Sequence, residues 1–322
     1  MKILITGAAG FIGSHLSERL LREEHQVWGL DNFDSYYDIS IKEANVARLQ
    51  QYPQFNLVRG DIRDATVIDK LWKDFNPDRV MHLAARAGVR PSIAEPALYS
   101  DVNITATIHL FEAARRHGIP VVFASSSSVY GGSDRVPYTE KDPVNKPISP
   151  YAASKRAGEL MAATYSHLYQ IPIICLRFFT VYGPGQRPDM AIHKFAKALL
   201  TDQPITLFGD GSTARDYTYI DDIVGGIVAS IERAPQLGYE IFNLGNNRTV
   251  QLLELVQLLE GISGKSADIQ WAPIQPGDVL LTSADITHAK ELLDYSPQTS
   301  IETGLKNTVE WVRECLSKNT AN

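Results

Sequence analysis

Tyr151 and Lys155 are the two residues whose types and spacing most directly suggest chemistry. They lie four apart in a segment with helical character that follows Pro147 and Pro150, so both side chains share one helical face. A phenol with an ordinary pKa of about 10 is a poor base at neutral pH, but a nearby positive charge favours the phenolate. We expect Tyr151 to accept a hydroxyl proton while hydride leaves the same carbon. Because Tyr-x-x-x-Lys is common on helices, this interpretation depends on the surrounding sequence.

A run of four serines, at residues 125–128, follows the short apolar segment 121–124. Such a segment is typical of a buried strand, which places the serines at the carboxyl end of that strand. Open α/β sheets bind their ligands at the carboxyl ends of the strands. The serine hydroxyls are therefore expected to hydrogen-bond the same substrate oxygen that Tyr151 approaches.

Gly7, Gly10 and Gly13 stand between an apolar strand at residues 2–5 and a helical segment at residues 14–23. Glycine lets the backbone turn sharply and come close to a pyrophosphate. The charge of that group is met by the unpaired N–H groups and the positive dipole end of the helix. The alternative is a glycine-rich turn that binds no ligand, since short motifs also match by chance.

Asp31 favours the ligand-binding interpretation. It ends a second predicted strand, residues 26–30, eighteen residues after Gly13, where a carboxylate accepts hydrogen bonds from the ribose hydroxyls of an adenosine. The same carboxylate repels a 2′-phosphate, and no arginine stands next to it in the sequence to reverse this preference. The site is therefore expected to bind NAD rather than NADP.

Two more strand ends carry candidate cofactor contacts. Asp61-Ile62 follows the predicted strand 56–58, and Leu83-Ala84-Ala85 ends the predicted strand 79–83. Both positions lie where an open α/β sheet binds its ligand. Taken alone, the two alanines are packing residues, and Asp61 could equally be the N-cap of a helix that starts near Asp64.

The elements that must position these residues predict the fold class. Short segments rich in Val, Ile and Leu alternate with longer segments of helical period. Strands that are apolar on both faces run parallel and are covered by helices on each side. We therefore predict an α/β protein with a Rossmann-type doubly wound parallel sheet. The predicted strands are residues 2–5, 26–30, 56–58, 79–83, 121–124 and 172–177.

The alternation loosens after Arg177. Prolines and glycines interrupt it at residues 184–188, a turn-rich stretch follows at 208–213, and shorter strands are expected near Tyr217 and Ile241. We expect residues 1–180 to form the NAD-binding domain. Residues 181–322 are expected to form mainly a smaller C-terminal α/β substrate lobe, with some later segments crossing back to the sheet.

Composition excludes several other classes. The chain of 322 residues has a formal net charge of -6 and no Lys/Arg block at either end, so neither nucleic acid nor an anionic membrane is an expected partner. No charged segment precedes an apolar stretch at the N-terminus, which argues against secretion. Cys175 and Cys315 form neither a disulfide framework nor a metal-binding spacing, so we expect no metal and a cytoplasmic location.

Taken together, these residues resemble the extended short-chain dehydrogenase/reductases. The resemblance rests on Thr6-Gly7-Ala8-Ala9-Gly10-Phe11-Ile12-Gly13, on His82-Leu83-Ala84-Ala85, on Ser126, and on Tyr151 with Lys155. It implies an NAD site that also includes Phe11, Ile12 and Asn32. It further implies a catalytic group of Ser126, Tyr151 and Lys155.

Within this family the chain is similar to the nucleotide-sugar epimerases, and most similar to the UDP-glucuronate 4-epimerases. The matching motifs are Arg177-Phe178-Phe179-Thr180-Val181-Tyr182-Gly183-Pro184, Arg187-Pro188-Asp189-Met190-Ala191, Gly209-Asp210-Gly211, residues 215–222 and Gln275-Pro276-Gly277-Asp278-Val279. The similarity implies inversion at C4 of UDP-glucuronate to UDP-galacturonate through a transient 4-keto sugar. Tyr151 would remove the 4-hydroxyl proton, and Lys155 would keep the phenolate and orient the nicotinamide ribose.

The same resemblance implies the substrate contacts. Arg187 would hold the sugar carboxylate through its guanidinium fork, assisted by hydroxyls of Ser126, Ser127 and Thr180. A β-keto acid readily loses carbon dioxide, so holding its carboxylate out of alignment selects the outcome. Ser128 is a further candidate.

Other candidates concern the rest of the nucleotide sugar. Arg90 is a weaker candidate for the carboxylate end, Arg215 resembles the diphosphate contact and Asp278 the uridine ribose contact. Hexose epimerases have Arg-x-Gly-Asp where this chain has Gln275-Pro276-Gly277-Asp278. A second phosphate-binding arginine is therefore expected from elsewhere.

Residue differences separate the neighbouring subfamilies. Dehydratases have Thr-Asp-Glu where this chain has Ser126-Ser127-Ser128, and decarboxylases have Glu at the position of Ser128. Both decarboxylases and galactose-type epimerases have Asn at the position of Thr180. A UDP-glucuronate decarboxylase and an epimerase of UDP-hexoses or UDP-N-acetylhexosamines remain alternatives. An alternative of another class is a non-catalytic NAD-binding sensor or scaffold, which would need neither Tyr151 nor Lys155. The resemblance also implies a homodimer, formed by the helix after Asn103 and the helix that carries Tyr151.

Overall fold

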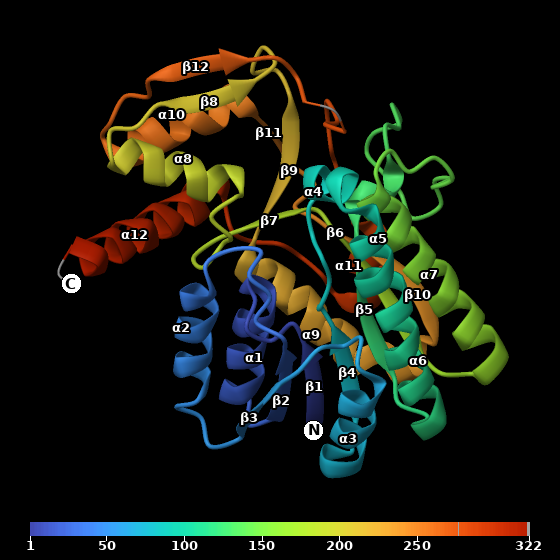
Figure 1. Ribbon diagram of the computed structural model, residues 1–322. Helices are drawn as coiled ribbons and strands as arrows, with labels where there is room; N and C mark the ends of the chain where they lie inside the picture. The colour runs from blue at the N-terminus through green and yellow to red at the C-terminus, as the bar shows by residue number, and fades with distance from the viewer. Residues whose placement is uncertain (276, 321–322) are drawn as a thin grey trace.

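A seven-stranded parallel sheet forms the centre of the molecule (Figure 1). The computed structural model describes residues 1–275 and 277–320. The strand order is β10-β6-β5-β4-β1-β2-β3, and every neighbouring pair is parallel. The predicted Rossmann-type doubly wound sheet is thus confirmed. The bounds of its strands are β1 Lys2–Thr6, β2 Gln26–Asp31, β3 Phe55–Arg59, β4 Arg79–His82, β5 Val121–Ser126, β6 Ile173–Phe178 and β10 Tyr239–Leu244.

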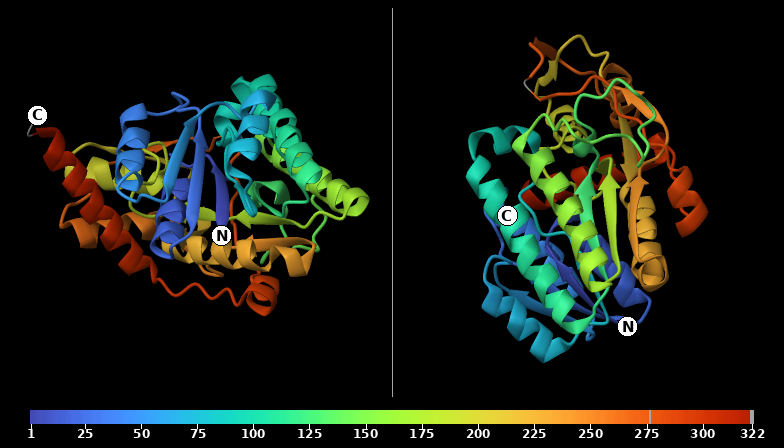
Figure 2. Two further views of the ribbon diagram at one scale, coloured as in Figure 1. Left: turned by 90° about the horizontal axis from the view of Figure 1, so that it is seen from below. Right: turned by 90° about the vertical axis from the view of Figure 1, so that its right-hand side faces the viewer.

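Side chains that alternate along each strand create two apolar layers. In β1, Ile3 and Ile5 belong to the cluster that the helices α1 and α9 cover, while Leu4 belongs to the cluster that α3, α6 and α7 cover. Helices therefore lie on both faces of the sheet (Figure 2). The helices of this part are α1 Phe11–Arg22, α2 Ile39–Leu49, α3 Ala65–Phe75, α4 Val89–Ala94, α5 Pro96–Ser100, α6 Ala106–His117, α7 Pro150–Tyr169, α9 Ile220–Leu237 and α11 Thr287–Leu293.

A smaller lobe lies beyond the carboxyl ends of the central strands (Figure 1). It contains a three-stranded sheet in the order β11-β9-β7 and a parallel pair of β12 with β8. Three helices pack together beside these strands. The elements of the lobe are β7 Thr180–Tyr182, β8 Ile205–Phe208, β9 Ala214–Tyr219, β11 Thr249–Gln251, β12 Ile269–Ala272, α8 Ala191–Leu200, α10 Leu252–Ser263 and α12 Ile301–Thr320.

The second half of the chain also contributes to the central sheet. After β9, helix α9 crosses one face of the sheet, and β10 then pairs with β6 in parallel, with Tyr239 opposite Ile173. Every residue of β6 is buried, so this strand needs a neighbour on each side. As a result the carboxyl ends of the central strands face the smaller lobe, and the cleft between them is where a ligand would bind.

Among the described residues, no helix is long and apolar enough to span a membrane. No group of three or more histidine, cysteine or acidic side chains in this part of the chain is arranged to hold a metal ion.

Candidate active site

A cleft of about 700 Å³ separates the central sheet from the smaller lobe. Each site residue expected from the sequence lines this cleft, except Lys155. From the cofactor set these are Gly7, Gly10, Phe11, Ile12, Gly13, Asp31, Asn32, Asp61, Ile62, Leu83, Ala84, Ala85 and Tyr151; from the substrate set they are Ser126, Ser127, Ser128, Thr180, Arg187, Arg215 and Asp278, together with Arg90. Pro276 of the motif around Asp278 lies outside the described residues.

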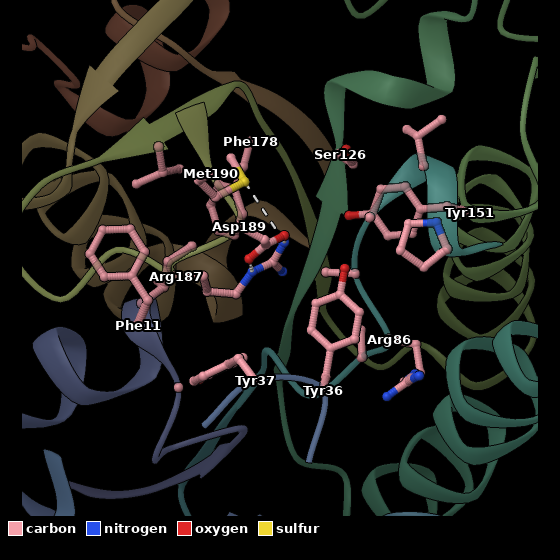
Figure 3. Close-up of a pocket in the computed structure, with 18 of the residues that line it drawn as sticks. Phe11, Tyr36, Tyr37, Arg86, Ser126, Tyr151, Phe178, Arg187, Asp189 and Met190 are labelled. Carbon is pink, nitrogen blue, oxygen red and sulfur yellow. Dashed lines mark hydrogen bonds and ion pairs between the residues drawn. The ribbon is translucent and has the colours of Figure 1, made fainter. Parts of the chain in front are cut away.

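Tyr151 enters the cleft from the second residue of α7. Ser149 caps this helix by accepting a hydrogen bond from the Ala152 amide at 3.1 Å, and Pro150 occupies its first turn. Burial raises the pKa of Tyr151, while a hydrogen bond with Ser126 and the charge of Arg187 lower it. Figure 3 shows Tyr151 and Ser126 together on one side of the cleft. The phenol therefore has a hydroxyl partner and a cationic neighbour.

Lys155 lies behind the cleft rather than in its lining. It is buried, and its Nζ donates a hydrogen bond to the Ala124 carbonyl of β5 at 2.7 Å. Burial lowers the pKa of Lys155 to about 8. The charge of Arg187 also acts on the Tyr151 phenol. The expected effect of Lys155 on the phenolate stays a prediction.

The glycine turn between β1 and α1 has no room for side chains. A Cβ atom on Gly7 would lie 2.9 Å from the Ala84 nitrogen, and one on Gly13 would lie 2.1 Å from the Gly7 carbonyl oxygen. Gly7 also adopts a positive φ of 73°, which glycine tolerates without strain. The start of α1 is thereby held against β4 with its N–H groups at the cleft. This geometry suits a pyrophosphate.

Asp31, at the end of β2, is buried and accepts hydrogen bonds from the amides of Ala9 and Phe33, at 3.1 and 2.8 Å. These bonds fix the carboxylate beside the glycine turn. The Nζ of Lys42 in α2 lies 3.4 Å from Asp31 and is also buried. The sequence showed no cation next to Asp31, because Lys42 reaches it only when α2 packs beside β2.

Asp61 extends the same wall of the cleft. It accepts hydrogen bonds from Asn32 and from the Arg63 guanidinium, both at 2.8 Å. Its bonds with Arg63, and to a smaller extent the one with Asn32, lower the pKa of Asp61 to about 2. The alternative in which Asp61 caps the next helix is wrong. The N-cap of α3 is Asp64, which accepts from the Thr66 amide at 2.9 Å, three residues further along the chain.

The opposite wall carries Arg187, on the segment between β7 and α8. Its Nε and Nη2 donate to the two carboxylate oxygens of Asp189 at 3.0 and 2.9 Å. The guanidinium carbon lies 5.3 Å from the centre of the Tyr36 ring. Figure 3 shows Arg187 and Asp189 across the cleft from Ser126 and Tyr151. Thr180, the first residue of β7, lines the same wall.

The outer part of the cleft contains several cations. Arg90 donates to Asp278 at 2.9 Å and lies 4.9 Å from the centre of the Phe208 ring, which joins α4 to the smaller lobe. Arg215 donates only to main-chain carbonyl groups, of Ala214 and Leu280, at 3.0 and 3.4 Å. Among the described residues, Arg215 has no carboxylate partner, so it is available to an anionic ligand.

Several polar or aromatic side chains of the lining were missed by the sequence reasoning, and five of them surround the predicted substrate and cofactor residues. These are Tyr36, Tyr37, Arg86, Asp189 and Lys194. The two tyrosines follow the Asp31 strand end closely, and Asp189 stands two residues after Arg187, so proximity to predicted residues was a usable signal. Lys194 lies in α8 and had no such signal. No carboxylate partner of Lys194 is found among the described residues.

Ser125 differs from its neighbours in the serine run. Its hydroxyl donates to Glu159 of α7 at 2.6 Å, below the cleft. Glu159 is fully buried and also binds Arg177 of β6 through two hydrogen bonds, at 2.8 and 2.9 Å. Arg177 in turn donates to the Tyr130 hydroxyl at 2.9 Å. This buried network fixes the strand end that carries Ser126.

A phenol and a serine hydroxyl that face a glycine turn on a doubly wound sheet define a class of protein, the extended short-chain dehydrogenase/reductases. Comparison with known proteins gives the family. A family model described as GDP-mannose 4,6 dehydratase matches residues 4–308 of this chain. The chain belongs to this family.

Individual relatives and solved structures show which members of the family this chain is similar to. A UDP-glucuronate 4-epimerase of Thermodesulfobacterium geofontis is 43% identical over 97% of this chain and 96% of its own length. A UDP-glucuronic acid 4-epimerase of Bacillus cereus, solved with UDP-glucuronic acid and NAD, has a TM-score of 0.93 and 40% identity, covering 98% of this chain and 100% of that one. A Thermotoga maritima UDP-glucose 4-epimerase, solved with UDP-glucose, has a TM-score of 0.90 and 32% identity at the same coverage.

Proposed function

We propose that this chain is an NAD-dependent UDP-glucuronate 4-epimerase, which interconverts UDP-glucuronate and UDP-galacturonate through a transient 4-keto sugar. The observation that carries the proposal is the placement of two groups across one cleft. Tyr151 with Ser126 lies on one side, and Arg187 lies on the other. A uronate sugar has a hydroxyl at C4 and a carboxylate on the adjacent C5, so one ring can engage both sides.

The residues present fit NAD. The backbone at the start of α1 packs so closely that a Cβ on Gly7 or Gly13 would collide with it, and the Asp31 carboxylate is fixed beside this turn. We propose that Gly7, Gly10, Phe11, Ile12 and Gly13 hold the pyrophosphate. The adenosine and nicotinamide portions would be held by Asp31, Asn32, Asp61, Ile62, Leu83, Ala84, Ala85, Tyr151 and Lys155. When bound, NAD supplies a reversible hydride acceptor.

Tyr151 would handle the proton of the C4 hydroxyl. Its Oη takes that proton when C4 is oxidised and gives it back when C4 is reduced from the other face, so no net proton change results. Ser126, which lies beside Tyr151 in the cleft, would share the same substrate oxygen through its hydroxyl. Lys155 holds the end of β5 through Ala124 and would orient the nicotinamide ribose.

Arg187 would bind the sugar carboxylate. A guanidinium fork matches two carboxylate oxygens and fixes the plane of the group. Oxidation at C4 makes a β-keto acid, which loses carbon dioxide when the bond to the carboxylate aligns with the carbonyl. A fixed carboxylate plane, supported by hydroxyls of Ser127, Ser128 and Thr180, would prevent that alignment. Arg187 would thus favour inversion over decarboxylation.

The diphosphate and the uridine would occupy the outer part of the cleft. Arg215 lies there without a carboxylate partner, and we propose Lys194 of α8 as the second cation that the diphosphate requires. Asp278 would accept hydrogen bonds from the uridine ribose, next to Arg90. Residues 1–180 would thus mainly bind NAD, and residues 181–322 mainly bind the nucleotide sugar.

The family description names a dehydratase, but the residues favour an epimerase. Elimination of water needs an acidic pair, and this chain has serine hydroxyls at Ser127 and Ser128. Thr180 occupies the position at which decarboxylases and hexose epimerases have Asn. We further propose a homodimer formed by α6 and α7, and action in the cytoplasm.

The experiment that tests the function is incubation of the enzyme and NAD with UDP-glucuronate, followed by NMR of the products. A mixture of UDP-glucuronate and UDP-galacturonate is expected, without carbon dioxide release. Carbon dioxide with a UDP-pentose would instead identify a decarboxylase. The variant Y151F should lose about 10²–10⁴-fold in turnover, the usual contribution of a positioned acid or base. Full activity of Y151F would refute the mechanism.

A further inference from the structure

Asp189 binds the guanidinium of Arg187 through both carboxylate oxygens, at 3.0 and 2.9 Å. This two-oxygen arrangement is the one that a sugar carboxylate would need at the same fork. Nη2 also lies 3.7 Å from the Met190 sulfur. The fork of Arg187 therefore already holds a carboxylate that belongs to the protein.

The two partners differ in their exposure. The Arg187 side chain is only 19% exposed, whereas Asp189 is 41% exposed at the rim of the cleft. The Tyr36 ring lies under the guanidinium, with 5.3 Å from its centre to the guanidinium carbon. Arg187 is thus held in place by its surroundings, while Asp189 has access to water. Asp189 is therefore the partner whose own charge is solvated when the pair opens, provided that another carboxylate pairs with Arg187.

We propose that Asp189 acts as an exchangeable stand-in for the sugar carboxylate and thereby sets how tightly Arg187 holds the substrate. This inference rests on the proposed function and extends it. The carboxylate of a uronate replaces Asp189 at the Arg187 guanidinium, and the Asp189 side chain becomes solvated. The exchange thus replaces one charged pair with another. A neutral sugar cannot displace a carboxylate and leaves the pair intact.

The same exchange lets the sugar carboxylate dissociate from the Arg187 guanidinium during turnover. Inversion requires the keto sugar to present its other face, and the carboxylate then has to move relative to the fixed Arg187. Asp189 can pair with the fork at that moment, so the guanidinium is not left unpaired in a partly buried site. Asp189 is therefore a positioning residue that acts through Arg187.

The test uses Asp189→Asn, which keeps the shape and removes the competing charge. In a Y151F background with NAD present, the Kd values of UDP-glucuronate and UDP-glucose are measured by calorimetry. D189N should bind UDP-glucuronate about ten-fold more tightly, the order expected for one charged hydrogen-bonded pair, with UDP-glucose unchanged. The matched control is D202N, the same change in an ion pair with Lys265 that lies outside the cleft lining. It should alter neither Kd.

Each other outcome overturns the inference. Unchanged or weaker binding of UDP-glucuronate by D189N would show that Asp189 does not compete for the fork. Equal weakening of both ligands would show that Asp189 only maintains the local fold. If Y151F enzyme with Asp189 intact binds UDP-glucose but not UDP-glucuronate, the proposed function itself fails and the inference fails with it. If it binds UDP-glucuronate and D189N has no effect, only the inference fails.

A kinetic experiment in the otherwise native enzyme separates exchange from simple competition. If the carboxylate leaves the fork during turnover, D189N should lower kcat and KM for UDP-glucuronate by similar factors, leaving kcat/KM nearly unchanged. A lower KM with unchanged kcat would overturn the part of the proposal in which Asp189 pairs with Arg187 while the keto sugar rotates in the site.

Discussion

Tyr151 is half-buried in the cleft and Lys155 is buried behind it, and burial acts on their pKa values in opposite directions. Burial raises the pKa of Tyr151 and lowers that of Lys155 to about 8, because each shift favours the uncharged form. A charged Lys155 at neutral pH is therefore costly for the fold. The chain retains it where hydrophobic packing would be more stable, which is typical of functional sites.

The variant Lys155→Met tests this cost. The pKa of Lys155 falls from its ordinary value of 10.5 to about 8, which corresponds to about 3 kcal/mol at neutral pH. The variant also loses the hydrogen bond to Ala124, which reduces its expected gain in the free energy of unfolding by about 1 kcal/mol. We expect NAD-free K155M to be about 2 kcal/mol more stable to urea than the native chain at pH 7, but inactive.

The pH dependence of this difference has a definite sign. Between pH 8 and 10.5 the unfolded native chain keeps the Lys155 proton while the folded chain loses it. The native chain therefore gains stability relative to K155M as pH rises through this window, and the advantage of K155M should disappear. Exposed Lys141 supplies the control, since K141M should show no such trend. A constant difference across the window would contradict the assignment.

Single residues also show which parts of the site a sequence can predict. Asp31 was predictable because its distance from the glycine turn along the chain is a property of one βαβ unit. The partners Lys42 at Asp31 and Asp189 at Arg187 were not predicted. The first depends on how α2 packs beside β2, and the second on how a short loop folds. Side-chain pairing of this kind is decided by tertiary structure.

At the scale of elements, one buried ion pair joins α7 to the central sheet. Glu159 of α7 and Arg177 of β6 are both almost fully buried, and Glu159 also accepts hydrogen bonds from Ser125 and Arg156. Arg177 and Ser125 occupy opposed positions on neighbouring strands. The helix that carries Tyr151 is thus tied to the strand end that carries Ser126.

Removing one partner of this pair should be costly. Glu159→Gln leaves the Arg177 charge buried and poorly paired, and we expect a loss of about 3–5 kcal/mol in the free energy of unfolding, measured in urea. The double variant E159L/R177M removes both charges and should recover most of that loss. The exposed pair of Glu43 and Arg59 provides the control, because E43Q should change stability little. Equal losses in E159Q and E159L/R177M would contradict a role of the unpaired charge.

The same scale explains which elements were predictable. The strands of the first half were predicted within one or two residues, because most of their residues are apolar and buried, in short segments bounded by turns. The pairing of β8 with β12 was not predicted. These strands are short and only partly buried, and more than 60 residues separate their partners Ile205 and Ile269. Local pattern carries no information about such pairings.

At the scale of the whole molecule, one flank matters for the proposed homodimer. Helices α6 and α7 lie side by side on the outside of the central sheet (Figures 1 and 2). Three large apolar side chains on α7 are exposed there, those of Leu160, Leu168 and Tyr169. A second copy of the chain could cover these side chains. This arrangement supports the proposed homodimer, in which α6 and α7 would pair with their copies.

The dimer is tested by placing charges on that flank. Leu160 and Leu168 are 53% and 60% exposed, so glutamate at either position leaves the fold of one chain intact while preventing two apolar flanks from meeting. We expect the native chain to have twice the chain mass by light scattering and L160E/L168E to have the single mass. Trp271, 53% exposed on the smaller lobe, supplies the matched control W271E, which should remain dimeric. Because Leu160 and Leu168 do not line the cleft, the monomeric variant should retain turnover. A monomeric native chain would refute the proposed dimer.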